Sequence, residues 1–348
     1  MIKSICFLTT YQCNAQCDYC ECGPRSKKER LGLADIIRLI DEAKGLGTVG
    51  QVVFSGGEPT LLGNNLFTAI RHAAQLGMLT RLVTNGWWGT SRDKAQVFLN
   101  RLIEAGLYEI NISVDDLHQR WIDLAHVRNS FLACYERKFK CLIAHKQMRN
   151  AKITQKYLES YFGVELVEFV PGKVYAEDEE CRLISSGPVV PVGRNEEHVD
   201  WSELVYSPWT GNCSSVLKDV IIGANCNLLP CCGIVSKNIP EFTRNDLRKT
   251  PLIEAIDQAN NDLILNWLAL EGPAAMARFV RERDHSISFR DFYVGICHIC
   301  NDVLTREDVR ATLSAHIDEV VERVSLHRDF FEKARSNEKI MEHYCRLG

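Results

Sequence analysis

The chain has 348 residues, a net charge of −4, 46% hydrophobic residues and 25% charged residues. This is the composition of an ordinary soluble globular protein, and the length is enough to bury one large core or two smaller ones. The dense basic run RSKKER at 25–30 is short, which argues against nucleic acid as a partner. The first residues lack the features of a signal peptide and no later stretch has the unbroken apolar length of a membrane span, so we expect a cytoplasmic protein with no membrane partner.

The chain contains 15 cysteines, which is many for a protein of this size. The cytosol keeps thiols reduced, and a core this large needs no cross-links, so disulfides do not explain them. Metal or iron-sulfur ligation is therefore favoured.

From residue 3 to about 172, short β-rich runs alternate with amphipathic stretches, which predicts βα units around a parallel sheet. The six expected strands are KSICFLTT, QVVFSGG, TRLVTNG, EINISVD, KCLIAHK and VELVEFVPG. Six such units make an open, partial barrel. Ligands of parallel α/β folds bind at the carboxyl ends of the strands, so the segments that follow the strands should carry the chemistry. These segments are CNAQCDYC, GGEP, NGWWG, DDLHQ and PGK.

Beyond about residue 175 the alternation stops, and the stretch from AEDEEC to SSGPVVPVGRNEEHVD is predicted to be a connector. A second, cysteine-bearing module begins near YSPWTGNCSS, ends at GICHIC and is followed by a predicted terminal helix. We therefore expect an α/β fold in which residues 1–205 form a partial (βα)6 TIM-like barrel. Residues 206–348 are expected to form a cysteine-rich C-terminal extension.

The loop after the first strand holds Cys13, Cys17 and Cys20 in Cys-x3-Cys-x2-Cys spacing. Three thiolates can ligate three irons of a four-iron cube and leave the fourth iron without a protein ligand, whereas electron carriers normally use four cysteines. An open iron can chelate a substrate. Taken alone, the same spacing is compatible with a zinc site or with incidental thiols.

This loop resembles the hallmark of the radical SAM superfamily, in which it follows the first strand of a partial barrel. The resemblance implies that Cys13, Cys17 and Cys20 bind a [4Fe-4S] cluster. It further implies that the open iron chelates S-adenosylmethionine, which an electron from the cluster cleaves to methionine and a 5′-deoxyadenosyl radical. Tyr19 stands where the family carries an aromatic residue near the adenine.

The segment GGEP, after the second predicted strand, resembles the family's second motif. The resemblance implies that Gly56, Gly57 and Glu58 receive the methionine amino group, because glycines permit close backbone approach and the glutamate offers negative charge. Three further residues stand at strand ends where relatives contact the carboxylate and ribose of the cofactor, although each is also compatible with a polar strand cap: Asn85, Ser113 and Asp115. The VPGK segment resembles the family's sixth-strand segment near the adenine.

The second module has its own cysteine pattern: Cys213, Cys226, Cys231, Cys232, Cys297 and Cys300. A pair near a turn together with a distant Cys-x2-Cys can close a four-thiolate site for structural zinc or for an iron-sulfur cluster. The module resembles the abbreviated auxiliary-cluster domains called twitch or SPASM, although Cys226 stands where they carry glycine, which leaves its role open. One auxiliary [4Fe-4S] cluster is expected, with these ligands: Cys213, Cys231, Cys297 and Cys300.

Over nearly its whole length the chain resembles the radical SAM peptide epimerases that make epipeptides, in segments such as TNGWWG, SVDDLHQ and DVIIGANCNLLPCCG. The resemblance implies a ribosomally synthesised precursor peptide as substrate and a reductase such as flavodoxin or ferredoxin as electron donor. The family chemistry removes a Cα hydrogen from an L-residue and returns hydrogen from a cysteine thiol on the opposite face. The match nominates Cys232 as this donor and Asp219 as a residue that orients the peptide or manages the thiol proton. A buried thiol and a strand-edge carboxylate are the alternatives for these two residues.

Two other functions are compatible with the sequence. A related enzyme could form thioether or carbon-carbon cross-links and would need no donor thiol. A non-radical iron-sulfur electron carrier or zinc-binding scaffold could retain the barrel. Trp87 and Trp88 could line a substrate groove or cover the core, and His118 is expected to be a hydrogen-bonding loop residue.

Overall fold

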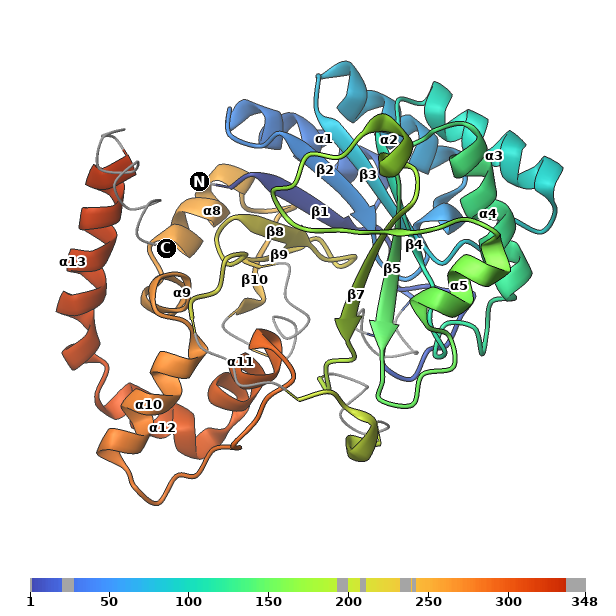
Figure 1. Cartoon of the computed structure of the whole chain (residues 1–348). Coiled ribbons are helices and arrows are strands. Elements are labelled where there is room, and N and C mark those ends of the chain that lie inside the picture. Colours follow the sequence, from blue (N-terminus) through green and yellow to red (C-terminus); the bar gives the residue numbers. More distant parts are fainter. Residues whose placement is uncertain are drawn as a thin grey trace.

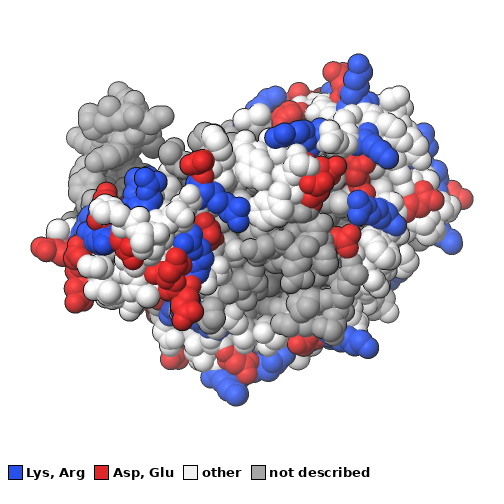
Figure 2. All heavy atoms as spheres, turned by 90° about the horizontal axis from the view of Figure 1, so that it is seen from below, with Lys and Arg blue, Asp and Glu red and all other residues white. Residues whose placement is uncertain are grey.

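The computed structural model describes residues 2–20, 28–192, 200–206, 211–231, 239 and 242–335. No helix within these ranges is both long enough and apolar enough to cross a membrane. Acidic and basic side chains are interspersed over the described part of the face seen in Figure 2. Cys22 and Cys232 lie outside the described residues.

The architecture is a ten-stranded sheet with the strand order β10-β9-β8-β1-β2-β3-β4-β5-β7-β6 (Figure 1). The barrel strands are parallel neighbours: β1 (Ser4–Leu8), β2 (Gln51–Ser55), β3 (Leu79–Thr84), β4 (Glu109–Ser113), β5 (Cys141–Gln147) and β7 (Leu183–Pro188). The connecting helices cover the outer face: α1 (Leu33–Gly45), α2 (Asn64–Gln75), α3 (Arg92–Glu104), α4 (Leu124–Glu136) and α5 (Gln155–Phe162). The predicted partial barrel is confirmed.

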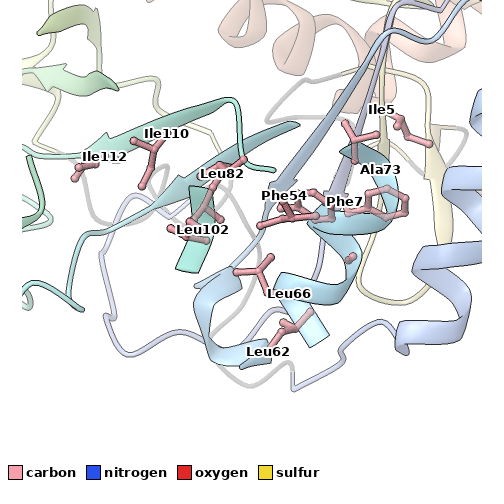
Figure 3. Close-up of a cluster of buried hydrophobic side chains, with 14 of the residues drawn as sticks. Ile5, Phe7, Phe54, Leu62, Leu66, Ala73, Leu82, Leu102, Ile110 and Ile112 are labelled. Carbon is pink, nitrogen blue, oxygen red and sulfur yellow. The ribbon is translucent and has the colours of Figure 1, made fainter. Parts of the chain in front are cut away.

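The barrel is held together by apolar side chains between the strands and these helices (Figure 3). Phe7 of β1 and Phe54 of β2 are fully buried, and their rings stack with centroids 6.1 Å apart. Leu66 of α2 and Leu82 of β3 belong to the same cluster and are also fully buried. Burial of each such side chain stabilises the fold by about 1.5–3 kcal/mol.

The sixth position of the barrel is not filled by the predicted strand. Next to β5 lies β7, which falls in the stretch expected to be a connector, as does the short helix α6 (Glu177–Glu180). The predicted strand contributes only β6 (Val167–Glu168), outside β7 at the end of the sheet. The sequence did not predict β7 as a strand because β7 lacks the apolar alternation of a strand. Only its first two side chains are buried, and half-buried Ser185 and Ser186 follow them.

The residues after 206 continue the same sheet and also enclose a second core. Strand β8 (Asp219–Ile222) runs parallel to β1, and β9 (Asn227–Leu229) and β10 (Arg244–Asp246) follow it in antiparallel fashion. The second core surrounds the fully buried Trp267. The helices of the extension are α8 (Leu252–Asn260), α9 (Leu263–Leu270), α10 (Pro273–Arg283), α11 (Ile296–Thr305), α12 (Glu307–Ala315) and α13 (Asp318–Arg335). Two 3-10 turns complete the secondary structure: η1 (Pro59–Leu62) and η2 (Trp201–Glu203).

The role of β7 as a barrel strand can be tested by truncating one side chain. Ile184 is fully buried in β7, so we expect Ile184→Ala to lower the free energy of unfolding by about 2–4 kcal/mol. The control is Val174→Ala, two residues after the segment predicted as a strand, where the side chain is 91% exposed and the change should stay within about 0.5 kcal/mol. Urea denaturation followed by circular dichroism measures both, and equal effects would contradict the placement of β7.

Candidate active site

The cysteine loop directly follows β1, at the carboxyl edge of the sheet, and contains Cys13, Cys17 and Cys20. Burial raises the pKa of the Cys13 thiol to about 11 and that of Cys17 to about 12, and the charge of Cys20 acts in the same direction on both. The three sulfur atoms therefore lie within electrostatic range of one another. The N–H group of Ala15 donates a hydrogen bond to Cys13 Sγ at 3.3 Å, the kind of contact that stabilises a thiolate ligand.

The donor set fits an iron-sulfur cluster. Among the described residues, no three His, Cys, Asp or Glu side chains converge closely enough to hold one metal ion. A cluster of several irons separates its thiolate ligands more widely than a single ion does, and it selects soft sulfur donors. The described residues of the loop offer three such donors: Cys13, Cys17 and Cys20.

Two glycines let the GGEP segment pack directly on the backbone of the cysteine loop. The N–H group of Gly57 donates to the carbonyl of Thr10 at 2.6 Å, and that of Glu58 to the carbonyl of Gln12 at 2.9 Å. A Cβ atom on Gly57 would lie 2.1 Å from the Gln12 carbonyl oxygen, and one on Gly56, whose φ is +130°, would lie 2.5 Å from that of Thr10. The close approach predicted for these glycines is therefore made, in this structure, to the loop itself.

The carboxylate of Glu58 is completely buried and joins the ends of β2 and β3. Its Oε1 accepts the hydroxyls of Thr60 at 2.6 Å and Thr84 at 2.8 Å, and its Oε2 accepts the N–H group of Asn85 at 2.9 Å. Burial raises the pKa of Glu58, and these hydrogen bonds oppose that shift. The two threonines were not singled out from the sequence, since isolated threonines carry no spacing signal.

Asn85 links this buried carboxylate to the cysteine loop. While its backbone binds Glu58, its side-chain Nδ2 donates to Asn14 Oδ1 at 2.8 Å and lies 3.8 Å from Cys13 Sγ. Its Oδ1 accepts the N–H group of Trp87 at 3.1 Å. The predicted site residue Asn85 is thus in contact with a predicted cluster ligand.

The two tryptophans of NGWWG complete the same network. Trp87 Nε1 donates to the hydroxyl of Thr60 at 2.9 Å, and Trp88 Nε1 donates to that of Thr84 at 3.3 Å. Trp88 is 6% exposed and stacks on Phe98 with centroids 4.9 Å apart. Of the two interpretations left by the sequence, Trp88 therefore fits core coverage.

A second buried carboxylate, Asp115, holds the other side of the cysteine loop. The hydroxyl of Tyr19 donates to Asp115 Oδ2 at 3.0 Å and lies 2.5 Å from His118 Nδ1, which is itself 2.8 Å from Asp115 Oδ2. Asp115 Oδ1 accepts the backbone N–H groups of Leu117 and His118, each at 2.9 Å. We call Tyr19, Asp115 and His118 the tyrosine clamp.

The charges of Asp115 and His118 favour the ionised form of each other. Burial would raise the pKa of Asp115, but the His118 ring and the hydrogen bonds hold it below its usual value. Burial would lower the pKa of His118, but the neighbouring carboxylate raises it above its usual value. Both oxygens of Asp115 are thus occupied by protein groups. Ser113, by contrast, is half-buried at the end of β4, and no described residue bonds to its hydroxyl.

Part of this arrangement could be predicted from the sequence. His118 was predicted to be a hydrogen-bonding loop residue, which the structure confirms. The Asp-x-x-His spacing is the signal for the pair of Asp115 and His118, because the loop turns back over that distance. The contact with Tyr19 joins residues far apart in the chain and had no such signal.

The extension gathers a second group of cysteines. Burial raises the pKa of Cys300 well above its usual value, and the charges of Cys231, Cys297 and Cys213 raise it further, in that order. Cys231 is buried in the second core, and Cys213, Cys297 and Cys300 pack against that core. Cys297 and Cys300 stand in the first turns of α11, and the backbone of Cys213 is fixed by a hydrogen bond to the Leu268 carbonyl at 3.0 Å.

Cys226 belongs to neither group. It lies in the turn between β8 and β9 with a φ of +68°, and its fully buried side chain joins the barrel core. That backbone conformation is left-handed, which glycine adopts without strain. The backbone thus accounts for the glycine that the resembling domains carry at this place.

Asp219 lies at the far end of β1 from the cysteine loop. It begins β8 opposite Ser4, whose hydroxyl donates to Asp219 Oδ1 at 2.7 Å. The antiparallel pairing of β8 with β9 ends at Ile221 and Leu229, and the N–H group of Asp219 donates to the carbonyl of Ser215 at 2.9 Å. Asp219 is therefore not part of the first cysteine group.

The close packing of Gly57 against the cysteine loop can be tested by adding a methyl group at residue 57. Gly57→Ala must push the loop away from GGEP, so we expect the free energy of unfolding to fall by about 1–3 kcal/mol and the iron bound after anaerobic reconstitution to decrease. Gly45→Ala is the matched control, because nothing lies within 4 Å of its added Cβ. A Gly57→Ala protein that bound as much iron as the Gly45→Ala protein would contradict this packing.

The tyrosine clamp predicts coupled losses. Tyr19→Phe removes one donor from a buried carboxylate and should cost about 1–3 kcal/mol of folding free energy. Tyr157→Phe, in a tyrosine that is 46% exposed, is the control. Combining Tyr19→Phe with His118→Ala should cost less than the sum of the single changes, since both act on Asp115. Strict additivity in urea denaturation would show that the three residues do not act as a unit.

Comparisons with known proteins agree with this geometry. Residues 7–151 match the radical SAM superfamily. "Putative peptide biosynthesis protein YydG" of Bacillus subtilis is 20% identical over 315 residues, which cover 86% of this chain and 92% of the relative. "PqqA peptide cyclase" of Xanthomonas oryzae pv. oryzae is 32% identical over 130 residues, which cover 36% of this chain and 33% of the relative.

Two solved structures share the fold. The structure of anSMEcpe with bound AdoMet has a TM-score of 0.57 at 12% identity and covers 93% of this chain and 98% of its own. Streptococcus suis SuiB bound to its precursor peptide SuiA has a TM-score of 0.50 at 15% identity, covering 75% of this chain and 65% of SuiB. A radical SAM domain implies a [4Fe-4S] cluster and S-adenosylmethionine. The cysteine loop, its glycine seat and the matched barrel together identify residues 7–151 as a radical SAM domain and the chain as an enzyme that carries this domain.

Proposed function

We propose that this enzyme modifies a ribosomally synthesised peptide by converting L-residues to D-residues at Cα. The relative named as a peptide biosynthesis protein matches most of both chains, and the shared fold extends to a structure that holds a precursor peptide. Both support a peptide as the substrate. When bound, the cluster and S-adenosylmethionine supply a 5′-deoxyadenosyl radical with an electron from a reductase such as flavodoxin or ferredoxin.

The described residues around the first cysteine loop would bind and orient these groups. Cys13, Cys17 and Cys20 would be the cluster ligands, and the free hydroxyl of Ser113 would contact the cofactor at the strand ends. Glu58 and Asn85 would form a rigid polar surface beside the cluster and the cofactor, since their hydrogen bonds hold both residues in place. The clamp would hold the Tyr19 ring in place near the adenine.

The packing of four cysteines at the second core is the observation that supports the choice of epimerisation: Cys213, Cys231, Cys297 and Cys300. Four thiols are enough for one auxiliary [4Fe-4S] cluster, so the next residue in the chain, Cys232, is not required as a ligand. An unligated thiol keeps its S–H bond, which is weak enough to give a hydrogen atom to a carbon radical. Ligation by iron would remove that proton.

Asp219 would assist the donor thiol. Leu217, two residues before Asp219, donates its N–H group to the carbonyl of Pro230, two residues before Cys232 in the chain, at 2.9 Å. It would orient the peptide or manage the thiol proton. The hydrogen bond from the Ser4 hydroxyl would hold the Asp219 carboxylate in place for this role.

The donor thiol is tested by Cys232→Ala in D2O, with S-adenosylmethionine, dithionite and the peptide encoded beside the gene. The unchanged enzyme should add a deuterium at Cα for each event and give a D-residue on chiral analysis, because a thiol proton exchanges with solvent. We expect Cys232→Ala to lose both. Cys134→Ala is the control, since that thiol is fully buried in the barrel core away from both cysteine groups.

Other outcomes would replace the proposal. If the peptide instead loses two hydrogen atoms per event, and Cys232→Ala does not change this, the enzyme forms thioether or carbon-carbon cross-links. The match to PqqA peptide cyclase covers 36% of this chain and 33% of that relative, so it does not support transfer of the cyclase reaction to this chain. Absence of 5′-deoxyadenosine from fully reconstituted protein would contradict radical chemistry altogether.

A further inference from the structure

A shallow pocket along α3 is a surface that the proposed peptide chemistry does not use. It has a volume of about 300 Å³ and is lined by Trp88, Asp93, Lys94, Val97, Phe98 and Arg101. Figure 1 shows α3 on the outer face of the barrel, on the side away from the helices of the extension. A partner can therefore reach this pocket without displacing the extension.

The floor of the pocket is aromatic. Trp88 stacks on Phe98, and Phe98 packs edge-on against Phe67 of α2 with ring centroids 5.7 Å apart. Val97 lines the same pocket and is 60% exposed. Apolar and aromatic side chains are typical of the centre of a protein interface. The pocket therefore offers an apolar centre on which a partner can pack.

This floor lies close to the first cysteine of the cysteine loop. Trp88 Nε1 donates to the hydroxyl of Thr84 at 3.3 Å, and Thr84 is followed in the chain by Asn85. The Nδ2 atom of Asn85 lies 3.8 Å from Cys13 Sγ. One hydrogen bond, one peptide bond and one side-chain contact thus connect the pocket to a predicted cluster ligand.

The charge around the pocket differs from that of the whole chain. Helices α2 and α3 together carry four Lys or Arg side chains and two carboxylates, whereas the net charge of the chain is −4. Arg92 pairs with Glu136 of α4, but Lys94 and Arg101 line the pocket and are exposed. The Arg101 guanidinium lies 4.2 Å above the Phe67 ring, beside the aromatic floor. A basic rim on an acidic protein favours a partner with an acidic surface.

The chemistry of the radical SAM domain indicates which class of acidic partner fits. Each cleavage of S-adenosylmethionine consumes one electron, which the proposed reductase must deliver to the cluster. Electron transfer is fast only over a short distance, so the reductase has to dock where a cluster ligand lies close to the surface. Transient electron-transfer complexes use small interfaces, below about 1,200 Å², and are steered by charge. A shallow basic pocket next to Cys13 meets these requirements.

We propose that the pocket on α3 is the docking site for an acidic flavodoxin-type electron donor. The reduced flavin of the donor is oxidised by one electron, and the [4Fe-4S] cluster is reduced by that electron. This inference rests on the proposed function for its reductase, and it is independent of epimerisation. It places the donor on the outer face of the barrel and leaves the open side of the barrel to the peptide.

Docking is tested with the reconstituted full-length enzyme and a purified bacterial flavodoxin of strongly negative net charge. Lys94→Glu reverses one charge of the pocket. Lys156→Glu is the matched control, because both lysines are exposed and lie in the first turn of a helix, α3 and α5 respectively. Fluorescence anisotropy with labelled, oxidised flavodoxin measures binding at low salt. We expect Lys94→Glu to weaken binding about tenfold and Lys156→Glu to leave it unchanged.

The rate of 5′-deoxyadenosine formation is the second measurement. With reduced flavodoxin at a limiting concentration, Lys94→Glu should lower this rate about tenfold, and added salt should shrink the difference because it screens surface charges. Val97→Glu should act in the same direction, since it removes an apolar contact and adds a negative charge. With dithionite, which is small enough to reduce the cluster without docking, both variants should keep the rate of the unchanged enzyme.

Four results would each overturn the docking site. They are no binding of flavodoxin by the unchanged enzyme, equal binding by Lys94→Glu and Lys156→Glu, equal flavodoxin-driven rates of these two variants, or a dithionite-driven rate that falls as much as the flavodoxin-driven rate. If one of them occurs while dithionite still drives formation of D-residues, the proposed function stands without this docking site. If docking is as expected and no D-residue forms, the docking site stands and epimerisation falls.

Discussion

The contact between the GGEP backbone and the cysteine loop is the constraint on which the rest of the site depends. Gly57 lies so close to Gln12 that no Cβ fits between them, and two backbone hydrogen bonds hold the segments together. This contact extends the pairing of β1 with β2 beyond the ends of both strands. At this contact the loop is fixed to the sheet by main-chain atoms, and its cysteine side chains stay available for ligands.

Two buried carboxylates secure this loop from opposite sides. Glu58 acts through Asn85 on the first cysteine of the loop, and Asp115 acts on Tyr19, next to the last one. A buried carboxylate is tolerated only when its oxygens are hydrogen-bonded, and here both have several donors. Any shift of the loop leaves one of the two buried carboxylates without hydrogen-bond partners, which costs free energy. The carboxylates therefore hold the loop in one position.

The sequence predicted the features that depend on local pattern. The first five strands, the cysteine spacings and GGEP were all readable because each is a short run of residues with its own period or spacing. The sixth barrel strand was missed because β7 buries only Leu183 and Ile184, and the more apolar segment before it lies at the edge. The partners of Glu58 and the pairing of Tyr19 with His118 were also missed. They join residues from different strand ends, and a single sequence holds no signal for such contacts.

The pairing of β8 with β1 has a consequence for how this protein is made. β1 lies between β2 and β8, and the segment from Ser4 to Phe7 finds its second neighbour only at residues 219–222. The strand that leads into the cysteine loop therefore leaves the ribosome 215 residues before its second neighbour and keeps an open edge over that interval. Contacts across such a separation form slowly. β1 is thus completed only when the extension arrives, and until then its edge can pair with other chains.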